Sequence, residues 1–230
     1  MATWPLTCTS ADTSYSKLQL TNKEACEVIP DLPLLYDEPF ADSSQIPTYL
    51  VSRAARQHVT IALSGDGADE LFGGYNRYIR GPGLWKRLSK VPKPLRQVSG
   101  HAAQALPEKA WDMIGGAYTR LRPGSTGISG LGTKVHRLGE RLRLIDSLDD
   151  LHRNMASTWI EPETVMAGNI SEPQSQLDDP LPAFGVDDPA MRMMVQDMRS
   201  YLPDDILCKV DRAAMGVSLE TRTPFLDPDV

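Results

Sequence analysis

The sequence predicts an α/β protein, with a partial parallel sheet near its start and a predominantly helical C-terminal half. Three observations lead to this prediction. A short apolar run, VTIAL at 59–63, follows an amphipathic stretch, as expected for a buried strand of a parallel sheet. The glycine-rich turn 64–67 follows that run directly. Beyond residue 80, apolar residues recur at helical spacing.

The first elements form a strand–helix–helix–strand pattern. KLQL at 17–20 predicts a short strand, and Thr21 with Glu24 forms a capping-box pattern that begins a helix at 22–29. YDEPFADSS at 36–44 is typical of a loop.

The next helix is predicted over 43–58. Ser43 or Ser44 can cap it, and Pro47 lies in its first turn, where proline is tolerated. The run 59–63 then completes one βαβ-like unit.

The rest of the chain is predicted to be mostly helical, with a polar, proline-rich loop at 171–189. The predicted helices cover 107–121, 133–146, 148–160, 190–202 and 203–220. The last one carries an apolar stripe made of Ile206, Val210, Ala213, Ala214 and Val217.

Composition excludes several classes of protein. The 230 residues, 41% hydrophobic and 23% charged, suit a globular protein of one large domain or of one and a half average ones. A net charge of −6 disfavours a nucleic-acid partner. The one basic run is interpreted as a solvated helical face and linker: Lys86, Arg87, Lys90, Lys93 and Arg96.

The sequence also indicates a cytoplasmic protein. It has no run of eighteen apolar residues and no basic, apolar leader at its start. The three cysteines are scattered and form neither a metal-binding spacing nor an even disulfide set: Cys8, Cys26 and Cys208.

The turn SGDG, residues 64–67, is the strongest candidate for a binding site. A strand that runs into such a turn directs backbone N–H groups past the sheet edge, where they attract anions such as phosphate. Gly65 and Gly67 allow a ligand to approach the backbone closely. Asp66 and Asp69 are three residues apart, and Mg²⁺ between carboxylates and phosphates would remove their repulsion.

A purely structural alternative stays open at this point. Asp66 and Asp69 can simply cap a helix and offset its dipole, while the glycines form a tight turn. The stretch is neither a Walker A loop, because the lysine is missing, nor a dinucleotide fingerprint, because Glu70 replaces the last glycine.

Two longer stretches resemble a known family. LYDEPFADSSQIPTYLVSRAARQHVTIALSGDGADELFGGYNRY at 35–78 and LPDDILCKVDRAAMGVSLETRTPFLD at 202–227 are similar to the synthetase domain of glutamine-hydrolysing asparagine synthetases. The resemblance covers about residues 15–227. As a pair, in this order, the two stretches are highly specific.

The resemblance implies an adenine-nucleotide α-hydrolase-like (ATP-pyrophosphatase) fold. It also implies that ATP adenylates the side-chain carboxylate of aspartate, after which ammonia gives asparagine, AMP and pyrophosphate. The implied cofactors are ATP and Mg²⁺. Ammonia would come from glutamine in a separate N-terminal glutaminase domain, and the full-length parent could form a homodimer.

Site residues follow from the same resemblance, position by position. Leu63, Ser64, Gly65 and Gly67 would line the nucleotide site. Asp66 would stand beside the reacting centre as a catalytic residue and also contact the nucleotide.

Asp69 would hold Mg²⁺ on the pyrophosphate. Lys209 is the second residue to which the resemblance gives a catalytic role. Its neighbours Asp205, Asp211 and Arg212 would lie close to the site in roles that stay open. For this group an alternative is a solvated helical face with Asp205 paired to Lys209 at i,i+4 spacing.

Other residues in these stretches favour structural roles. Glu220 and Arg222 are interpreted as an ion pair that braces the RTPFLD turn. Tyr75 and Tyr78 are interpreted as packing residues.

Parts of the family's machinery are not found in the 230 residues. They contain no S-G-G-x-D-S pyrophosphate loop, no amidotransferase domain and no further lysine after PFLD. We therefore expect a fragment of a longer synthetase, divided into 15–80, 81–189 and 190–230. An unpaired sheet edge would then promote association. Alternatives are a sister amidotransferase acting on another carboxylate, such as a β-lactam synthetase or an exopolysaccharide-associated enzyme, and a non-catalytic remnant.

Overall fold

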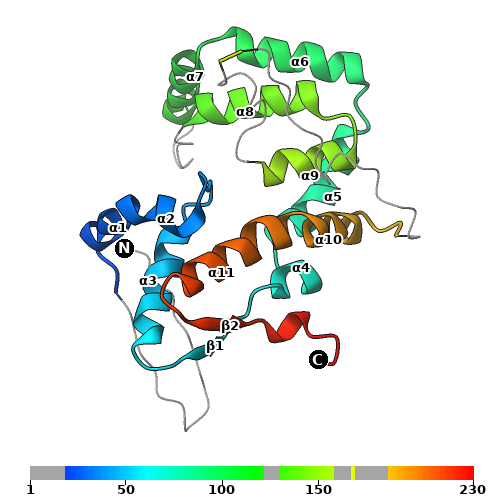
Figure 1. The fold of residues 1–230 in the computed structure, drawn as a ribbon. Coiled ribbons are helices and arrows are strands. Elements are labelled where there is room, and N and C mark those ends of the chain that lie inside the picture. Colours follow the sequence, from blue (N-terminus) through cyan, green and yellow to red (C-terminus); the bar gives the residue numbers. More distant parts are fainter. Residues whose placement is uncertain (1–18, 122–129, 158–166, 169–185) are drawn as a thin grey trace. The chain divides into compact units, whose positions relative to one another are not determined.

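The computed structural model describes residues 19–121, 130–157, 167–168 and 186–230 (Figure 1). The chain divides into two compact units. The first comprises Met1–Leu71 with Met198–Val230, and the second comprises Phe72–Asp197. The second hallmark stretch and most of the first therefore belong to the first unit, and the intervening helices make up most of the second.

The first unit begins with three short helices: α1 (Asn22–Val28), η1 (Ile29–Asp31) and α2 (Leu32–Tyr36). The capping box predicted at Thr21 is confirmed. The Glu24 N–H donates to the Thr21 hydroxyl at 3.3 Å, and the Thr21 N–H donates to the Glu24 carboxylate at 2.8 Å.

The strand predicted at 17–20 is not supported where it can be examined. Residues 17–18 lie outside the described residues, and residues 19–20 belong to no strand.

The helix predicted over 43–58 is confirmed as α3 (Gln45–Arg56). Ser44 is its N-cap residue, but its side chain does not cap the helix. The Ser44 hydroxyl donates to Asp42 at 2.6 Å, so the side chain is directed toward the preceding loop and not toward the N–H groups of the helix.

A small parallel sheet is present in the first unit, as predicted, but the partner of the strand at 61–63 is the segment 220–222 and not the predicted strand at 17–20. β1 (Ile61–Leu63) pairs with β2 (Glu220–Arg222), with Ile61 opposite Glu220 and Leu63 opposite Arg222. The expectation that this strand is buried on both sides is wrong, because Ile61 is 45% and Leu63 74% exposed. Within the described part of the chain β1 has β2 as its only neighbouring strand.

The C-terminal hallmark stretch departs from the single helix predicted over 203–220. It starts as a π-helix, η3 (Leu202–Leu207), continues as α11 (Cys208–Met215) and ends with η4 (Pro224–Leu226). The helix stops because Ser218 adopts the left-handed conformation (φ 60°), and the Leu219 N–H then bonds to the Ala214 carbonyl at 2.9 Å.

The predicted apolar stripe of this stretch forms the core of the first unit. Four of its members are buried and Val217 is half-buried: Ile206, Val210, Ala213 and Ala214. Helix α11 packs against α3 and against β2 (Figure 1). This packing orients the beginning of α11, and it determines where Lys209 lies.

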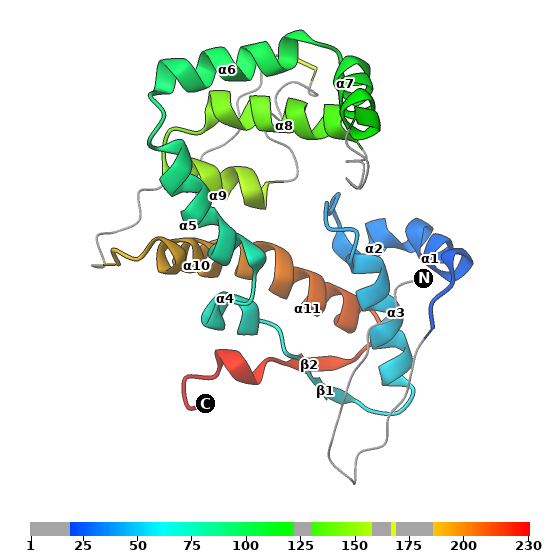
Figure 2. The ribbon, with the colours of Figure 1, turned by 180° about the vertical axis from the view of Figure 1, so that it is seen from behind.

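The second unit is helical in its described residues (Figures 1 and 2). Its helices are α5 (Asn76–Leu88), α6 (Lys93–Ala105), α7 (Glu108–Leu121), α8 (Leu131–Leu144), α9 (Leu148–Ala156) and α10 (Pro189–Arg199), and α4 (Ala68–Phe72) lies at the boundary of the two units. Helices α6 and α8 lie side by side. Their backbones touch at Gly100 and Gly139, where a β-carbon on Gly100 would lie 2.5 Å from the Gly139 carbonyl oxygen.

Most helices predicted here are confirmed, as α7, α8, α9 and α10. Of the helix predicted over 148–160, residues 158–160 lie outside the described residues. The loop predicted at 171–189 likewise falls outside them up to residue 185, and Pro189 begins α10.

Within the basic run, the interpretation of Arg96 as a solvated side chain is wrong. Arg96 is buried, and its Nη1 donates to the Ile145 carbonyl at 2.5 Å. The linker interpretation also misses α6, which begins at Lys93 in the middle of this run.

Candidate functional site

The turn after β1 brings the two hallmark stretches into direct contact. The Ser64 N–H donates to the Arg222 carbonyl at 2.8 Å, extending the β1–β2 ladder by one bond. Gly67 has φ +88°, and a β-carbon there would lie 2.6 Å from Cδ2 of Leu226. Glycine is therefore required at 67 for both its backbone conformation and the close approach of the PFLD segment.

The same turn presents free backbone donors. The carbonyls of Gly65 and Gly67 accept bonds from Ala68 and Leu71 as α4 begins. We find no acceptor among the described residues for the N–H groups of Gly65, Asp66 and Gly67. Successive unpaired N–H groups at a glycine turn form an anion-binding concavity, which fits the predicted phosphate contacts.

The two predicted carboxylates of this turn have different environments. Asp66 is half-buried, and its carboxylate accepts a hydrogen bond from the Ser64 hydroxyl. The Asp66 side chain is therefore directed toward its own loop. Asp69 is exposed in the first turn of α4 and makes no hydrogen bond within the described residues. An exposed carboxylate without a protein partner suits the predicted contact with a hydrated Mg²⁺.

The third predicted element, Lys209, lies at the beginning of α11. Its side chain is largely buried, and its Nζ lies 2.6 Å from Oδ2 of Asp42. The i,i+4 pair between Lys209 and Asp205 is therefore not formed. The π-helix that ends at Leu207 changes the helical register between these two positions.

Asp42 is itself firmly held. The Ser44 N–H and hydroxyl donate to its two carboxylate oxygens at 2.8 and 2.6 Å. Burial alone would raise the pKa of Asp42, but the bonds from Lys209 and Ser44 outweigh it and lower the pKa to about 2. The carboxylate thus stays ionised at physiological pH.

A second contact holds the backbone of Lys209. The buried Tyr36 hydroxyl donates to the Lys209 carbonyl at 3.2 Å, and the Tyr36 ring stacks on Phe40 at 4.8 Å between centroids. Burial, with the nearby Cys208 and Asp42, raises the pKa of Tyr36 to about 12, so it remains a donor.

The remaining predicted neighbours of Lys209 lie at the surface. Arg212 pairs with Asp37 at 2.9 Å, with both side chains well exposed, and Asp211 is exposed. Glu220 and Arg222 form the predicted ion pair at 2.8 Å, although solvent-exposed pairs of this kind contribute little.

Chain direction places these groups at one edge of the sheet. β1 and β2 are parallel, so the turn 64–67 and the segment 223–226 both follow carboxyl ends of strands. Helix α11 precedes β2 and packs along it, so the first residues of α11 lie toward that same edge (Figure 1). Ligands of open α/β sheets bind beyond this edge.

Sequence reasoning did not single out two residues that the structure brings forward. Asp42 lay within a stretch interpreted only as a loop, and no local pattern links it to Lys209, 167 positions away. Asp197 is fully buried in the second unit and binds Arg77, Tyr78 and His152. Tyr78 is buried, as its interpretation as a packing residue expected, but its hydroxyl also donates to Asp197.

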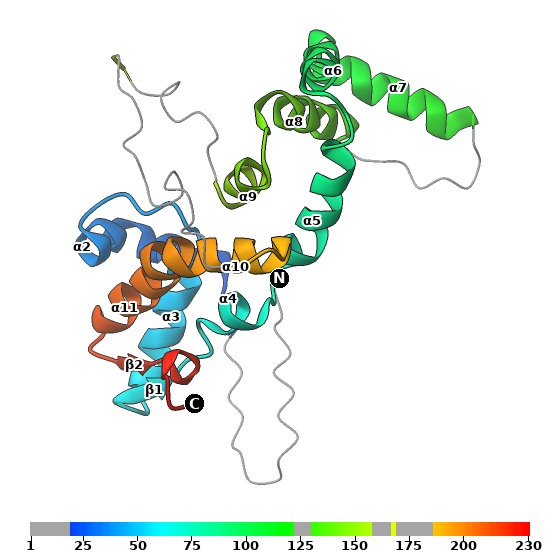
Figure 3. The same ribbon diagram turned by 90° about the vertical axis from the view of Figure 1, so that its right-hand side faces the viewer.

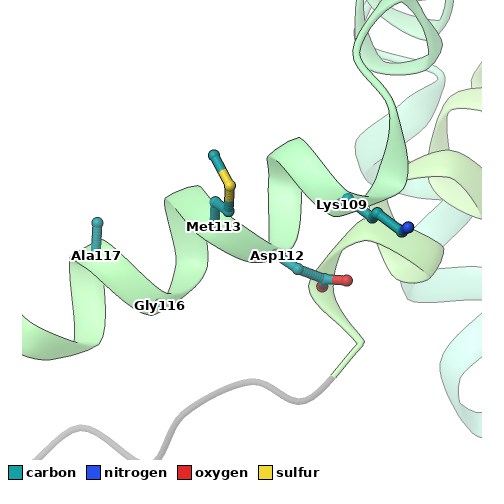
Figure 4. A pocket seen from close by; sticks show the side chains of 5 residues that line it. All are labelled: Lys109, Asp112, Met113, Gly116 and Ala117. Atoms are coloured by element: carbon teal, nitrogen blue, oxygen red, sulfur yellow. The ribbon is translucent and has the colours of Figure 1, made fainter.

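An open surface pocket lies elsewhere in the described residues. It has a volume of about 500 Å³ and is lined by one helix, α7, through Lys109, Asp112, Met113, Gly116 and Ala117 (Figure 4). None of the predicted site residues lines it.

The described residues contain no group of three or more His, Cys, Asp or Glu side chains able to hold a metal ion. None of the helices in this part of the chain is long and apolar enough to cross a membrane.

Comparisons with known proteins converge on one family. The profile described as asparagine synthase matches residues 6–230. A Mycobacterium bovis protein named provisionally as a glutamine-hydrolysing asparagine synthetase is 35% identical over 209 residues. Glutamine-hydrolysing asparagine synthetase 1 of Bacillus subtilis is 30% identical over 212 residues. Each alignment covers 90% of this chain but only 28% and 29% of the relatives, so the chain spans little more than a quarter of their length. No solved structure gives a significant match.

Proposed function

The chain belongs to the asparagine synthase family, and from this premise we propose that it carries part of an ATP-dependent synthetase site that makes asparagine. In this proposal ATP adenylates the side-chain carboxylate of aspartate and releases pyrophosphate. Ammonia then displaces AMP to form the amide. The observation that carries the proposal is the contact of the turn 64–67 with Arg222 and Leu226, which joins both hallmark stretches at the carboxyl edge of a parallel sheet.

The unpaired N–H groups of the turn support a phosphate site. Adenylation brings a carboxylate and a triphosphate together, so positioning and charge neutralisation are what a protein can supply. The N–H groups of Gly65, Asp66 and Gly67 would bind phosphate oxygens, and Leu63 and Ser64 would line the nucleotide pocket. Asp66, held by the Ser64 hydroxyl, would stand beside the reacting carboxylate.

Asp69 is proposed as the residue that holds Mg²⁺. Its exposed carboxylate fits a metal that keeps most of its waters and takes its other oxygens from phosphate. When bound, Mg²⁺ would neutralise charge on the pyrophosphate leaving group. Lys209 would supply a fixed positive charge at the same edge.

The fold type and the nitrogen donor belong to the same proposal. Two parallel strands, with a glycine turn after β1 and helix α11 before β2, fit part of an adenine-nucleotide α-hydrolase-like sheet. The relatives are named glutamine-hydrolysing, so ammonia derived from glutamine is the proposed nitrogen donor.

Isothermal titration of the purified chain with ATP, with and without Mg²⁺, tests the proposal. We expect binding that requires Mg²⁺ and is lost in Asp69→Ala. Glu27→Ala is the matched control, because Glu27 is an exposed carboxylate on α1 whose contact is a solvent-exposed pair with Lys23. If the wild-type chain is folded by circular dichroism but does not bind MgATP, the proposal is wrong for this chain.

A further inference from the structure

Lys209 is unusual among the described basic residues of the first unit because its side chain is largely buried. That side chain is 10% exposed, whereas the side chain of Arg212, one turn later, is 47% exposed. Removing an ammonium from water is costly, so a lysine stays charged in a buried position only when a close, well-placed partner compensates its charge. Within the described part of the chain, Asp42 is the one residue that forms an ion pair or hydrogen bond with its Nζ.

The segment 36–42 forms two hydrogen bonds with Lys209. The carboxylate of Asp42 holds the ammonium, and the phenol of Tyr36 holds the backbone carbonyl. The segment is braced in turn, because the Gln45 amide donates to the Phe40 carbonyl at 2.9 Å and the Thr48 hydroxyl donates to the Ser44 carbonyl at 2.8 Å.

From this geometry we propose that Asp42 is a positioning residue, which holds the ammonium of Lys209 fixed at the carboxyl edge of the sheet, facing the triphosphate or pyrophosphate of the ligand. This inference rests on the proposed function, since it gives Lys209 an anionic ligand to meet. An ammonium held by one carboxylate keeps two N–H donors for phosphate oxygens. A lysine already fixed in place loses little conformational entropy when the ligand binds.

The chemical reactivity of Lys209 tests the first half of the proposal without any ligand. Lysine acetylation by an N-hydroxysuccinimide ester, mapped by mass spectrometry, reports how much neutral, accessible amine each lysine carries. Lys23, whose side chain is 86% exposed, is the internal standard. We expect Asp42→Asn to increase the acetylation rate of Lys209 at least fivefold relative to Lys23, because the amine then loses the carboxylate that holds it in an ion pair.

Two further variants separate charge from folding. Asp42→Glu keeps the negative charge, and we expect it to leave Lys209 within twofold of its original rate. Ser44→Ala removes the hydroxyl bond to the carboxylate, and we expect an intermediate increase. Equal rates in Asp42→Asn and the wild type, with both proteins folded, would overturn the proposal.

Protection by MgATP tests the second half. In the wild type, saturating MgATP should lower the acetylation of Lys209 at least threefold and leave that of Lys23 unchanged. If calorimetry shows that MgATP binds but Lys209 is not protected, the ammonium does not face the nucleotide and the proposal fails. If MgATP does not bind at all while Asp42→Asn still increases the acetylation rate of Lys209, the proposed function fails and Asp42 only stabilises the fold.

Discussion

The carboxylate of Asp197 lies 2.8 Å from Nε of Arg77, 120 residues earlier in the chain. The Tyr78 hydroxyl donates to the same oxygen, and Nε2 of His152 lies 3.0 Å from the other one. The group joins α5, α9 and α10 within the second unit, where α5 and α9 lie side by side (Figure 3). Burial alone would lower the pKa of Arg77, but the negative charge of Asp197 outweighs it and raises that pKa. Burial and Asp197 together raise the pKa of Tyr78.

Removing Asp197 should destabilise the second unit strongly. Asp197→Ala leaves the Arg77 guanidinium without its carboxylate, and breaking a buried ion pair on one side costs about 3–5 kcal/mol. Tyr78→Phe removes one hydrogen bond and should cost about 1–3 kcal/mol. Urea denaturation followed by circular dichroism measures both. A loss in Asp197→Ala no larger than that in Tyr78→Phe would contradict the central role of this carboxylate.

The two glycines of the turn 64–67 should respond differently to alanine. Gly67→Ala should cost about 1–3 kcal/mol, because φ is +88° and the β-carbon would clash with Leu226. Gly65→Ala is the matched control, since the closest atom to a β-carbon there is Cε2 of Phe225 at 3.9 Å. Thermal unfolding of both variants checks this. Equal melting temperatures would show that the turn is not constrained by the PFLD segment.

A second glycine comparison tests the contact of α6 with α8. Gly100→Ala should destabilise the protein by about 1–3 kcal/mol, because the added methyl group meets the Gly139 backbone. Gly116→Ala on α7 meets no atom within 4 Å and should stabilise the helix by up to about 1 kcal/mol. Chemical denaturation should show a decrease in the free energy of unfolding for Gly100→Ala and an increase for Gly116→Ala. Decreases of similar size in both variants would argue against the close contact of α6 with α8.

Acid should weaken the first unit through Asp42. Its pKa in the folded chain is about 2, below the ordinary value of 3.8, so its contribution to stability is present above about pH 4 and is lost as the pH falls toward 2. The side chain is 21% exposed, so we expect the contribution to be about 1 kcal/mol. Asp42→Asn should lie below the wild type in stability at pH 7 and approach it near pH 2. A constant difference across this range would contradict the prediction.

The elements that depend on nearby residues were predictable. The capping box of Thr21 and Glu24 spans three positions, and its hydrogen bonds form within the first turn of α1. The strand at 61–63 follows from a short apolar run, and helices such as α7 and α8 follow from the helical period of their apolar residues. The turn 64–67 was also identifiable, because glycine at close spacing marks a backbone position that other residues cannot occupy.

Other features escaped prediction because they depend on distant partners. The end of the last long helix depends on Ser218, a residue type that rarely adopts a positive φ, and the pattern of apolar residues continues past it. The basic residues around Arg96 in the sequence indicated a solvated side chain. In the structure Arg96 is buried and donates a hydrogen bond to the carbonyl of Ile145, 49 residues away. The division into 15–80, 81–189 and 190–230, and the ligand contacts of the site, stay predictions.

The residue pattern was enough to identify the family, most of the helices and the glycine turn with its carboxylates. These properties are encoded in residue types over short distances, where backbone sterics and apolar periodicity act. Only the tertiary structure decided which charges meet. Lys209 is held by Asp42 rather than by Asp205, and Arg77 by Asp197. Such pairs form where burial makes an unpaired charge costly, and burial is a property of the packed chain.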